Sequence, residues 1–197
     1  MLQDEDITNS KIKILFIIAL FLFSVNAFAQ DEKTTWETVY SDHGVSIFHR
    51  YEIMLSEYKI VQGGKEFVLD PMNRAEFTEE KIDQNRSLLR IGYSGGSGTG
   101  IAVYRDFVIY VNKAEPVLMA NILSGGYTAN PMDDPIVHQA GVEGLSVNKT
   151  TLQIKYAYGI EGKAQKEYQY SVPMTKMIPE QDECEFIMKA IYGELEE

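Results

Sequence analysis

The residues best suited to bind a metal ion lie together in the stretch NPMDDPIVH. Asp133 and Asp134 offer carboxylate oxygens, and His138 offers an imidazole nitrogen. Calcium and similar hard cations bind carboxylates, whereas imidazole is a common ligand of zinc. Asn-Pro and Asp-Pro pairs are also ordinary turn formers. The stretch therefore favours a solvated loop, with a metal site at these three residues as the alternative, and no motif predicts a bound cofactor.

A second group of candidates consists of tyrosines in the C-terminal third of the chain. They are Tyr156, Tyr158, Tyr168 and Tyr170, with Tyr104 and Tyr110 earlier in the sequence. Tyrosine combines a large apolar ring with a polar tip, which suits it to contacts with sugars or peptides. Because Ile154 and Val172 share their strand faces, packing in the core is the favoured alternative. The first four tyrosines remain the candidate ligand-binding residues.

No catalytic residue is predicted. Gly92–Gly96 matches the G-x-S-x-G pattern around Ser94, but in hydrolases a helix follows that serine. Here more glycine and then a strand pattern follow, so a flexible turn explains the motif. Cys184, the only cysteine, lies among apolar residues with helical spacing and is expected to be a small buried hydrophobe. The sequence leaves enzymatic activity uncertain and disfavours it.

The elements that must position these residues are mainly β-strands. Ser87–Asn112 contains two runs with period-two alternation around a turn rich in glycine and serine, which predicts a central hairpin. Its second run is apolar on both faces, as in a strand covered from both sides. Thr151–Val172 alternates more clearly still and predicts a half-exposed hairpin. The fold class predicted is an antiparallel β-sandwich or curved sheet.

One amphipathic helix is expected at the C-terminus, over residues 179–193. Pro179 suits a first helical position, and acidic residues follow it where the helix dipole favours them. An apolar stripe with helical spacing includes Ile187 and Ile191 and must dock on the sheet. Gly193 is expected to end the helix.

Three stretches are harder to interpret. Residues 70–86 are rich in charge and predict a loop with a helical turn. Residues 116–124 are apolar and fit a short helix or a buried strand equally well. Residues 127–144 have no sustained period and are expected to form the longest irregular segment, where function often resides.

The N-terminal residues have the pattern of a secretory signal peptide. Lys11 and Lys13 precede an apolar run that ends in Ala27-Phe28-Ala29. Residues 1–29 are therefore expected to be cleaved, leaving a single β-rich domain over residues 30–197. The run is shorter than the ~20 residues that a membrane-spanning helix needs, so we expect no stable membrane span after cleavage. The expected location is the periplasm or the exterior of a bacterial cell.

The formal net charge of −11 limits the possible partners. An acidic surface repels phosphate backbones, which disfavours nucleic acid. The leading hypothesis is an exported, non-catalytic binding or envelope-structural domain that recognises an envelope protein or a glycan. The alternative is a carrier with an apolar ligand, such as a lipid, in a cavity between the sheet and the C-terminal helix. A hydrolase or metalloenzyme ranks below both.

Overall fold

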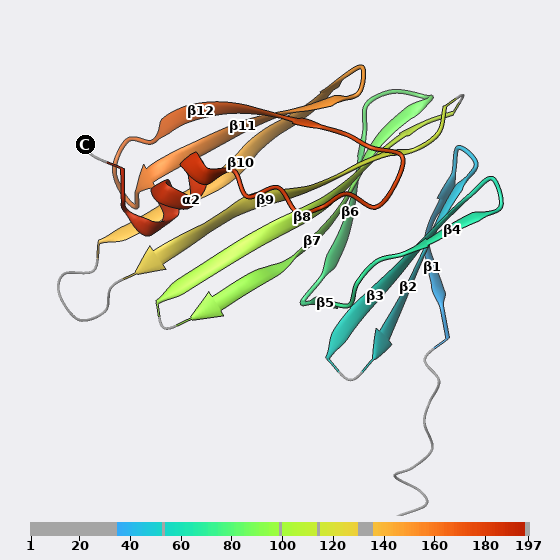
Figure 1. Ribbon diagram of the computed structural model, residues 1–197, viewed down its shortest axis with the longest axis horizontal. Helices are drawn as coiled ribbons and strands as arrows, with labels where there is room; N and C mark the ends of the chain where they lie inside the picture. Colours follow the sequence, from blue (N-terminus) through green and yellow to red (C-terminus); the bar gives the residue numbers. More distant parts are fainter. Residues whose placement is uncertain (1–34, 53, 99, 114, 130–135, 196–197) are drawn as a thin grey trace, which may run out of the picture. The chain divides into compact units, whose positions relative to one another are not determined.

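A computed structural model describes residues 35–52, 54–98, 100–113, 115–129 and 136–195. These residues form two antiparallel sheets and one C-terminal helix, as the sequence predicts (Figure 1). The signal-peptide prediction for residues 1–29 lies outside the described residues. Within them, no helix is long and apolar enough to cross a membrane.

The smaller sheet comes first in the chain. Its strands are β1 (Glu37–Asp42), β2 (Val45–Glu52), β3 (Leu55–Gln62), β4 (Lys65–Val68) and β5 (Met72–Asn73). The order is β1-β2-β3-β4, and β5 pairs with β3. Gly63 and Gly64 join β3 to β4 with φ angles of 55° and 76°, a left-handed backbone that glycine adopts readily.

The larger sheet is a meander of seven strands. They are β6 (Glu76–Lys81), β7 (Arg86–Gly98), β8 (Ile101–Asn112), β9 (Leu118–Ala129), β10 (Val137–Asn148), β11 (Thr151–Ile160) and β12 (Lys166–Pro173). Each strand pairs with its neighbour in sequence, from β6 at one edge to β12 at the other. Both predicted hairpins are confirmed, as β7–β8 and β11–β12.

Two predictions about irregular stretches are wrong, and in a third stretch the structure distinguishes between the two alternatives. Residues 70–86 are not a loop with a helical turn, because β5 and β6 lie there. Within residues 116–124 the strand alternative is correct, since β9 begins at Leu118 and continues through Ser124. The described part of residues 127–144 is largely regular, because β9 continues to Ala129 and β10 begins at Val137.

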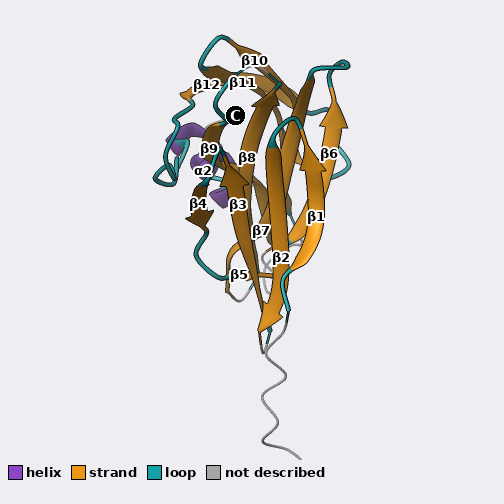
Figure 2. Cartoon of the chain, turned by 90° about the vertical axis from the view of Figure 1, so that its right-hand side faces the viewer, coloured by secondary structure: helices purple, strands orange, loops and turns teal. Residues whose placement is uncertain are grey.

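Strand β8 is covered on both faces. Phe107 and Ile109 belong to a buried cluster that also contains Ile47 and Ile60 of the small sheet, so this cluster lies between the two sheets (Figure 2). Val108, between them in sequence, belongs to a second cluster with residues of β9, β11 and the helix. Successive side chains of a strand point to opposite faces, and the apolar run of β8 therefore serves two cores.

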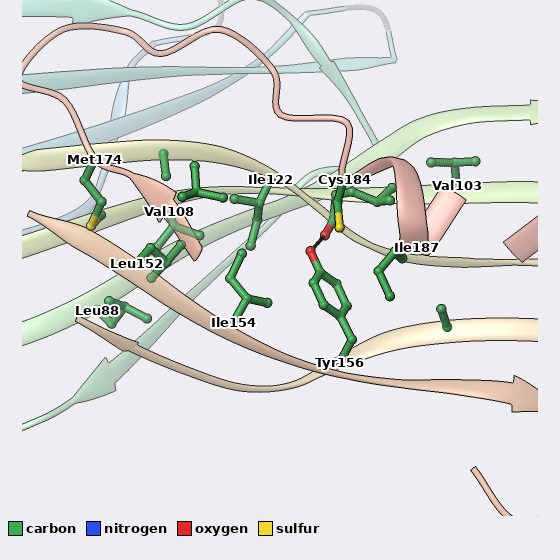
Figure 3. Packing of buried hydrophobic residues seen from close by; sticks show 14 of the residues in the cluster. Leu88, Val103, Val108, Ile122, Leu152, Ile154, Tyr156, Met174, Cys184 and Ile187 are labelled. Atoms are coloured by element: carbon green, nitrogen blue, oxygen red, sulfur yellow. Dashed lines mark hydrogen bonds between the residues drawn. The ribbon is translucent and has the colours of Figure 1, made fainter. Parts of the chain in front are cut away.

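The large sheet curls strongly along the meander. Leu88 of β7 and Leu152 of β11 are separated by three strands of the sheet, yet they belong to one buried cluster. Figure 3 shows Leu152 and Ile154 beside Val108 and Ile122. Register shifts mark bulges in β7 and β10, and bulges bend and twist a sheet locally. The curl allows one sheet to enclose much of its own core.

Helix α2 (Glu185–Tyr192) closes that core. It contacts β9, β10 and β11, and Ile187 and Ile191 are fully buried. Gly193 ends the helix in the left-handed conformation with φ 71°, as predicted. Cys184, just before the helix, is buried as expected, and burial raises the pKa of its thiol.

The helix begins at Glu185 and not at Pro179, because the preceding segment is held in an extended form. The backbone N–H of Asp182 donates to the carbonyl oxygen of Asn121 in β9, over 2.8 Å. The buried guanidinium of Arg105 donates through Nη2 to both carboxylate oxygens of Glu183, at 2.9 Å each. Gly95 leaves room for this arginine, since a Cβ there would lie 2.7 Å from its side chain.

Candidate functional site

The tyrosines singled out in the sequence lie largely beneath helix α2. Tyr156 is fully buried, and its hydroxyl donates to the carbonyl oxygen of Leu123 over 2.5 Å, as Figure 3 shows. Tyr168 stacks on Phe186 of the helix with ring centres 4.1 Å apart, and Tyr158 meets the same ring edge-on at 5.2 Å. These rings are used to hold the helix on the sheet.

Tyr170 completes this aromatic group and carries a perturbed hydroxyl. Its O–H donates to Asp182 Oδ2 over 3.2 Å. Burial, followed by repulsion between a tyrosinate and the Asp182 carboxylate, raises the pKa of Tyr170 to about 12. Burial likewise raises the pKa of Tyr156. Both hydroxyls are therefore stabilised as neutral donors in the folded protein.

These shifts predict a loss of stability at alkaline pH. In the unfolded chain tyrosine loses its proton near pH 10, whereas folded Tyr170 keeps it until about pH 12. The folded state thus binds more protons between these values, and the free energy of unfolding must fall as pH rises through that window. Urea denaturation at several pH values should show a constant stability below about pH 9.5 and a decline above pH 10.

Tyr170→Phe provides the matched comparison for this decline. Phenylalanine keeps the ring but cannot ionise, so the variant should lose less stability between pH 10 and 12 than the wild type does. An equal decline in both proteins would contradict the role of Tyr170. Absorbance of tyrosinate during the titration would show which tyrosines ionise before the protein unfolds.

The proposed metal ligands are only partly within the described residues. Asp133 and Asp134 lie outside them. His138 lies at the start of β10, where its ring would be 2.9 Å from a Cβ added to Gly193. Among the described residues, no group of three or more histidine, cysteine or acidic side chains is arranged to hold a metal ion.

A different site emerges from the register of the large sheet. Ser94, Tyr104, Gly125, Gly141 and Ala157 are successive cross-strand partners from β7 to β11. Directly paired residues in an antiparallel sheet have their side chains on the same face. Strands lie 4.7–4.9 Å apart, so this row spans roughly 19 Å. Its face is opposite to that of Tyr156, which precedes Ala157 in β11.

A second row runs beside the first and carries another tyrosine. Ala102, Tyr127 and Gln139 are partners across β8, β9 and β10. Tyr127 and Tyr104 are diagonal neighbours on one face, and their exposed fractions are 40% and 46%. Diagonal neighbours are ~7–8 Å apart, within reach of aromatic side chains. Both rings are therefore exposed on the same face of the sheet.

The sheet surface next to these two rings, which we call the floor, is formed by glycines and has few side chains. Gly125 must be glycine, because a Cβ there would lie 2.5 Å from the carbonyl oxygen of Ala140 and its φ is 153°. Gly141 has only open space where its Cβ would be. The glycine backbone lies below the exposed side chains of Tyr104 and Tyr127, and this difference in height forms a groove.

The groove consists of two adjoining hollows of about 520 Å³ each. Tyr104, Ser124 and Tyr127 line both hollows, and the second extends over the floor at Gly141. We call this feature the tyrosine groove. Clefts of 300–1,000 Å³ are the usual size for binding small molecules or short segments of a polymer.

Polar side chains are distributed along the tyrosine groove. Glu76 and Ser94 line its first hollow, and Gln139 and Glu143 line its second. They provide hydroxyl, amide and carboxylate groups on both sides of the tyrosine pair. A ligand with many hydroxyl groups would find hydrogen-bond partners throughout.

A buried ion pair lies where the hollows meet. Arg90 Nε donates to Asp106 Oδ2 over 2.6 Å, and Nη2 contacts the same oxygen. The Asp106 side chain is only 6% exposed, whereas that of Arg90 is 33% exposed. Gly92 makes room for the carboxylate, since a Cβ there would lie 3.2 Å from Asp106 Oδ1. The ion pair fixes the position of both side chains in the lining of the groove.

Most residues of the groove escaped the sequence-based selection. The sequence pattern points to Tyr104 among the tyrosines and to Ser94 in a glycine-rich motif, and Tyr127 and Gln139 fall within residues 127–144. The available signal was a set of glycines and tyrosines in neighbouring strands, which becomes meaningful only when the register is known.

Comparison with known proteins does not assign the chain to a family. No protein-family model matches the chain, and neither the curated proteins nor the solved structures contain a match. The function is therefore inferred from the geometry and chemistry of the groove.

Proposed function

We propose that the protein is a non-catalytic binding domain that holds a neutral glycan in the tyrosine groove. The observation that carries this proposal is the exposed pair of Tyr104 and Tyr127 above a floor of glycine. Sugar rings have flat apolar faces that pack on aromatic side chains, and their edges carry hydroxyl groups. The groove offers both kinds of contact along its length.

Charge selects among glycans. The groove contains Glu76 and Glu143, and the chain as a whole has a formal net charge of −11. Acidic polysaccharides would be repelled by this field. Carboxylates accept hydrogen bonds from sugar hydroxyl groups without a charge on the sugar. A neutral glycan is therefore the favoured ligand.

The arrangement of carboxylates favours binding over hydrolysis. Glycosidases usually place two carboxyl groups on either side of the scissile bond. In the groove, Asp106 is held by Arg90, and Glu143 is 3.2 Å from the Nζ of Lys155. Two of the three groove carboxylates are therefore paired with basic side chains, and Glu76 is the remaining acidic residue of the lining. The proposal of an exported domain in the bacterial envelope continues to rest on residues 1–29 of the sequence.

Gly141→Trp tests the proposal directly. The glycine lies on the floor with open space above it, so an indole there would fill the groove without displacing the core. We expect wild-type protein to be retarded in native gels containing at least one neutral polysaccharide, and G141W to migrate as it does without polysaccharide. A panel of neutral glucans, mannans and xylans, with an acidic polygalacturonate, covers the relevant chemistry.

Gly144→Trp is the matched control. Gly144 is also in β10 and also has open space at its Cβ, but it does not line the groove. G144W should bind the glycan as the wild type does. Binding that survives G141W, or no retardation by any glycan, would refute the proposal. A G141W-sensitive complex with an envelope protein and no glycan would assign the groove to a protein partner.

A further inference from the structure

A separate hollow lies at the C-terminal end of helix α2, away from the tyrosine groove. It has a volume of about 390 Å³ and shares no lining residue with the groove. Tyr158 lines it and also contacts Phe186 of α2, so the hollow lies on the helix-covered face of the sheet. Ala190 and Gly193 form its helical wall.

Half of the residues that line this hollow have apolar side chains. Its apolar lining comes from Tyr158 and Ile160 in β11, Ala164 in the following turn, and Ala190 and Leu195 in the C-terminal region. Small alanine side chains on two sides leave space that larger residues would occupy. Apolar surface that borders such a hollow gains free energy when a hydrocarbon group covers it.

The same lining also carries positive charge. Lys163 and Lys166 line it, and His138 adds an imidazole. Neither lysine forms an ion pair with any residue that the structure describes, and the lining contains no carboxylate. In a chain with a formal net charge of −11, two lysines beside an apolar hollow create a local site for an anion.

We propose that this hollow binds a small amphipathic anion, a monocarboxylate with an unbranched hydrocarbon body. The carboxylate lies at the rim with Lys163 and Lys166, and the hydrocarbon covers Tyr158, Ile160 and Ala190. A lysine ammonium binds such a group as a point charge with three donors. The ligand class is thus set by the two lysines and the apolar side chains of one lining.

Chain length provides a quantitative signature of this binding mode. Burial of a CH₂ group contributes ~0.8 kcal/mol, which corresponds to about a fourfold change in Kd per methylene. Affinity should therefore increase about fourfold with each methylene, or roughly 16-fold from hexanoate to octanoate, and then level off when the hollow is full. 1-Octanol, which has no charge, and octylammonium, which has the wrong charge, should bind at least tenfold more weakly than octanoate.

The lysines are tested by charge removal in the full mature chain. Calorimetric titration with octanoate should give at least a tenfold higher Kd for the double variant Lys163→Gln/Lys166→Gln. The control Lys65→Gln/Lys81→Gln removes the same charge from exposed lysines elsewhere and should retain the wild-type Kd. Equal losses in both double variants would show that only net charge matters, and would overturn the site.

Ala164→Phe tests the apolar part of the hollow. Ala164 is exposed in the turn after β11, so a larger side chain there fills the hollow without entering the core. We expect octanoate binding to be lost while thermal unfolding stays unchanged. Octanoate bound with wild-type affinity by A164F, or octylammonium bound as tightly as octanoate, would refute the proposal. Neither result bears on glycan binding, which is measured separately with G141W.

Discussion

Replacing Ile187 with alanine is expected to lower the free energy of unfolding by about 2–5 kcal/mol, the usual range for isoleucine truncated in a packed core. Ile187 is fully buried and belongs to the cluster between α2 and the large sheet. The loss is a large share of the ~5–15 kcal/mol that stabilises a typical domain. Urea denaturation followed by circular dichroism would measure it.

Ile178→Ala is the matched control for this variant. Ile178 is 46% exposed and lies in the segment that leads to α2, so its truncation should change stability by less than about 0.5 kcal/mol. If Ile187→Ala cost ~1 kcal/mol or less, the space beneath the helix would be hollow and the helix would act as a lid. That outcome would favour a carrier with a large cavity over a solid core.

Removing the rings of Tyr104 and Tyr127 together is expected to abolish measurable glycan binding while the fold is retained. Truncation of a tyrosine that anchors a ligand costs about 1–2 kcal/mol, or roughly 5–30-fold in Kd. Two such losses would add to roughly 30–900-fold if independent. Both side chains are at least 40% exposed, so the double alanine variant should unfold at nearly the wild-type urea concentration.

Two further variants separate stacking from a general loss of aromatic surface. Tyr192→Ala removes a tyrosine that is also 40% exposed but lies on α2, and it should bind glycan normally. Tyr104→Phe/Tyr127→Phe keeps both rings and should retain most of the affinity. A double alanine variant that binds as well as the wild type would show that the groove is not the glycan site.

The sequence alone was sufficient to predict those strands and helices whose buried residues recur at a regular spacing. Ile101–Asn112 has β-branched or aromatic residues at most positions of both faces. It forms β8, which lies between the two cores. Thr151–Ile160 has a buried and a half-exposed face, and its period of two is visible directly. The apolar stripe of α2 likewise predicted that Ile187 and Ile191 would dock. In each case the spacing of apolar residues along the sequence indicates which side chains are buried.

Other elements have no such period and were decided by tertiary contacts. Strand β6 is an edge strand whose residues are exposed apart from Phe77, so its sequence resembles a charged loop. The acidic residues after Pro179 resemble the first turn of a helix. Hydrogen bonds to β9 and the ion pair of Glu183 with Arg105 hold them extended instead.

The glycines of the groove show most clearly what only the tertiary structure decided. In the sequence, Gly125 and Gly126 mark the end of an apolar run. In the structure they lie inside β9, where a Cβ on Gly126 would be 2.4 Å from the carbonyl oxygen of Ala102. They are glycine because neighbouring backbones approach closely there. The same absence of side chains leaves Tyr104 and Tyr127 standing above the floor. Local sequence cannot show this, because the pairing of β8, β9 and β10 creates it.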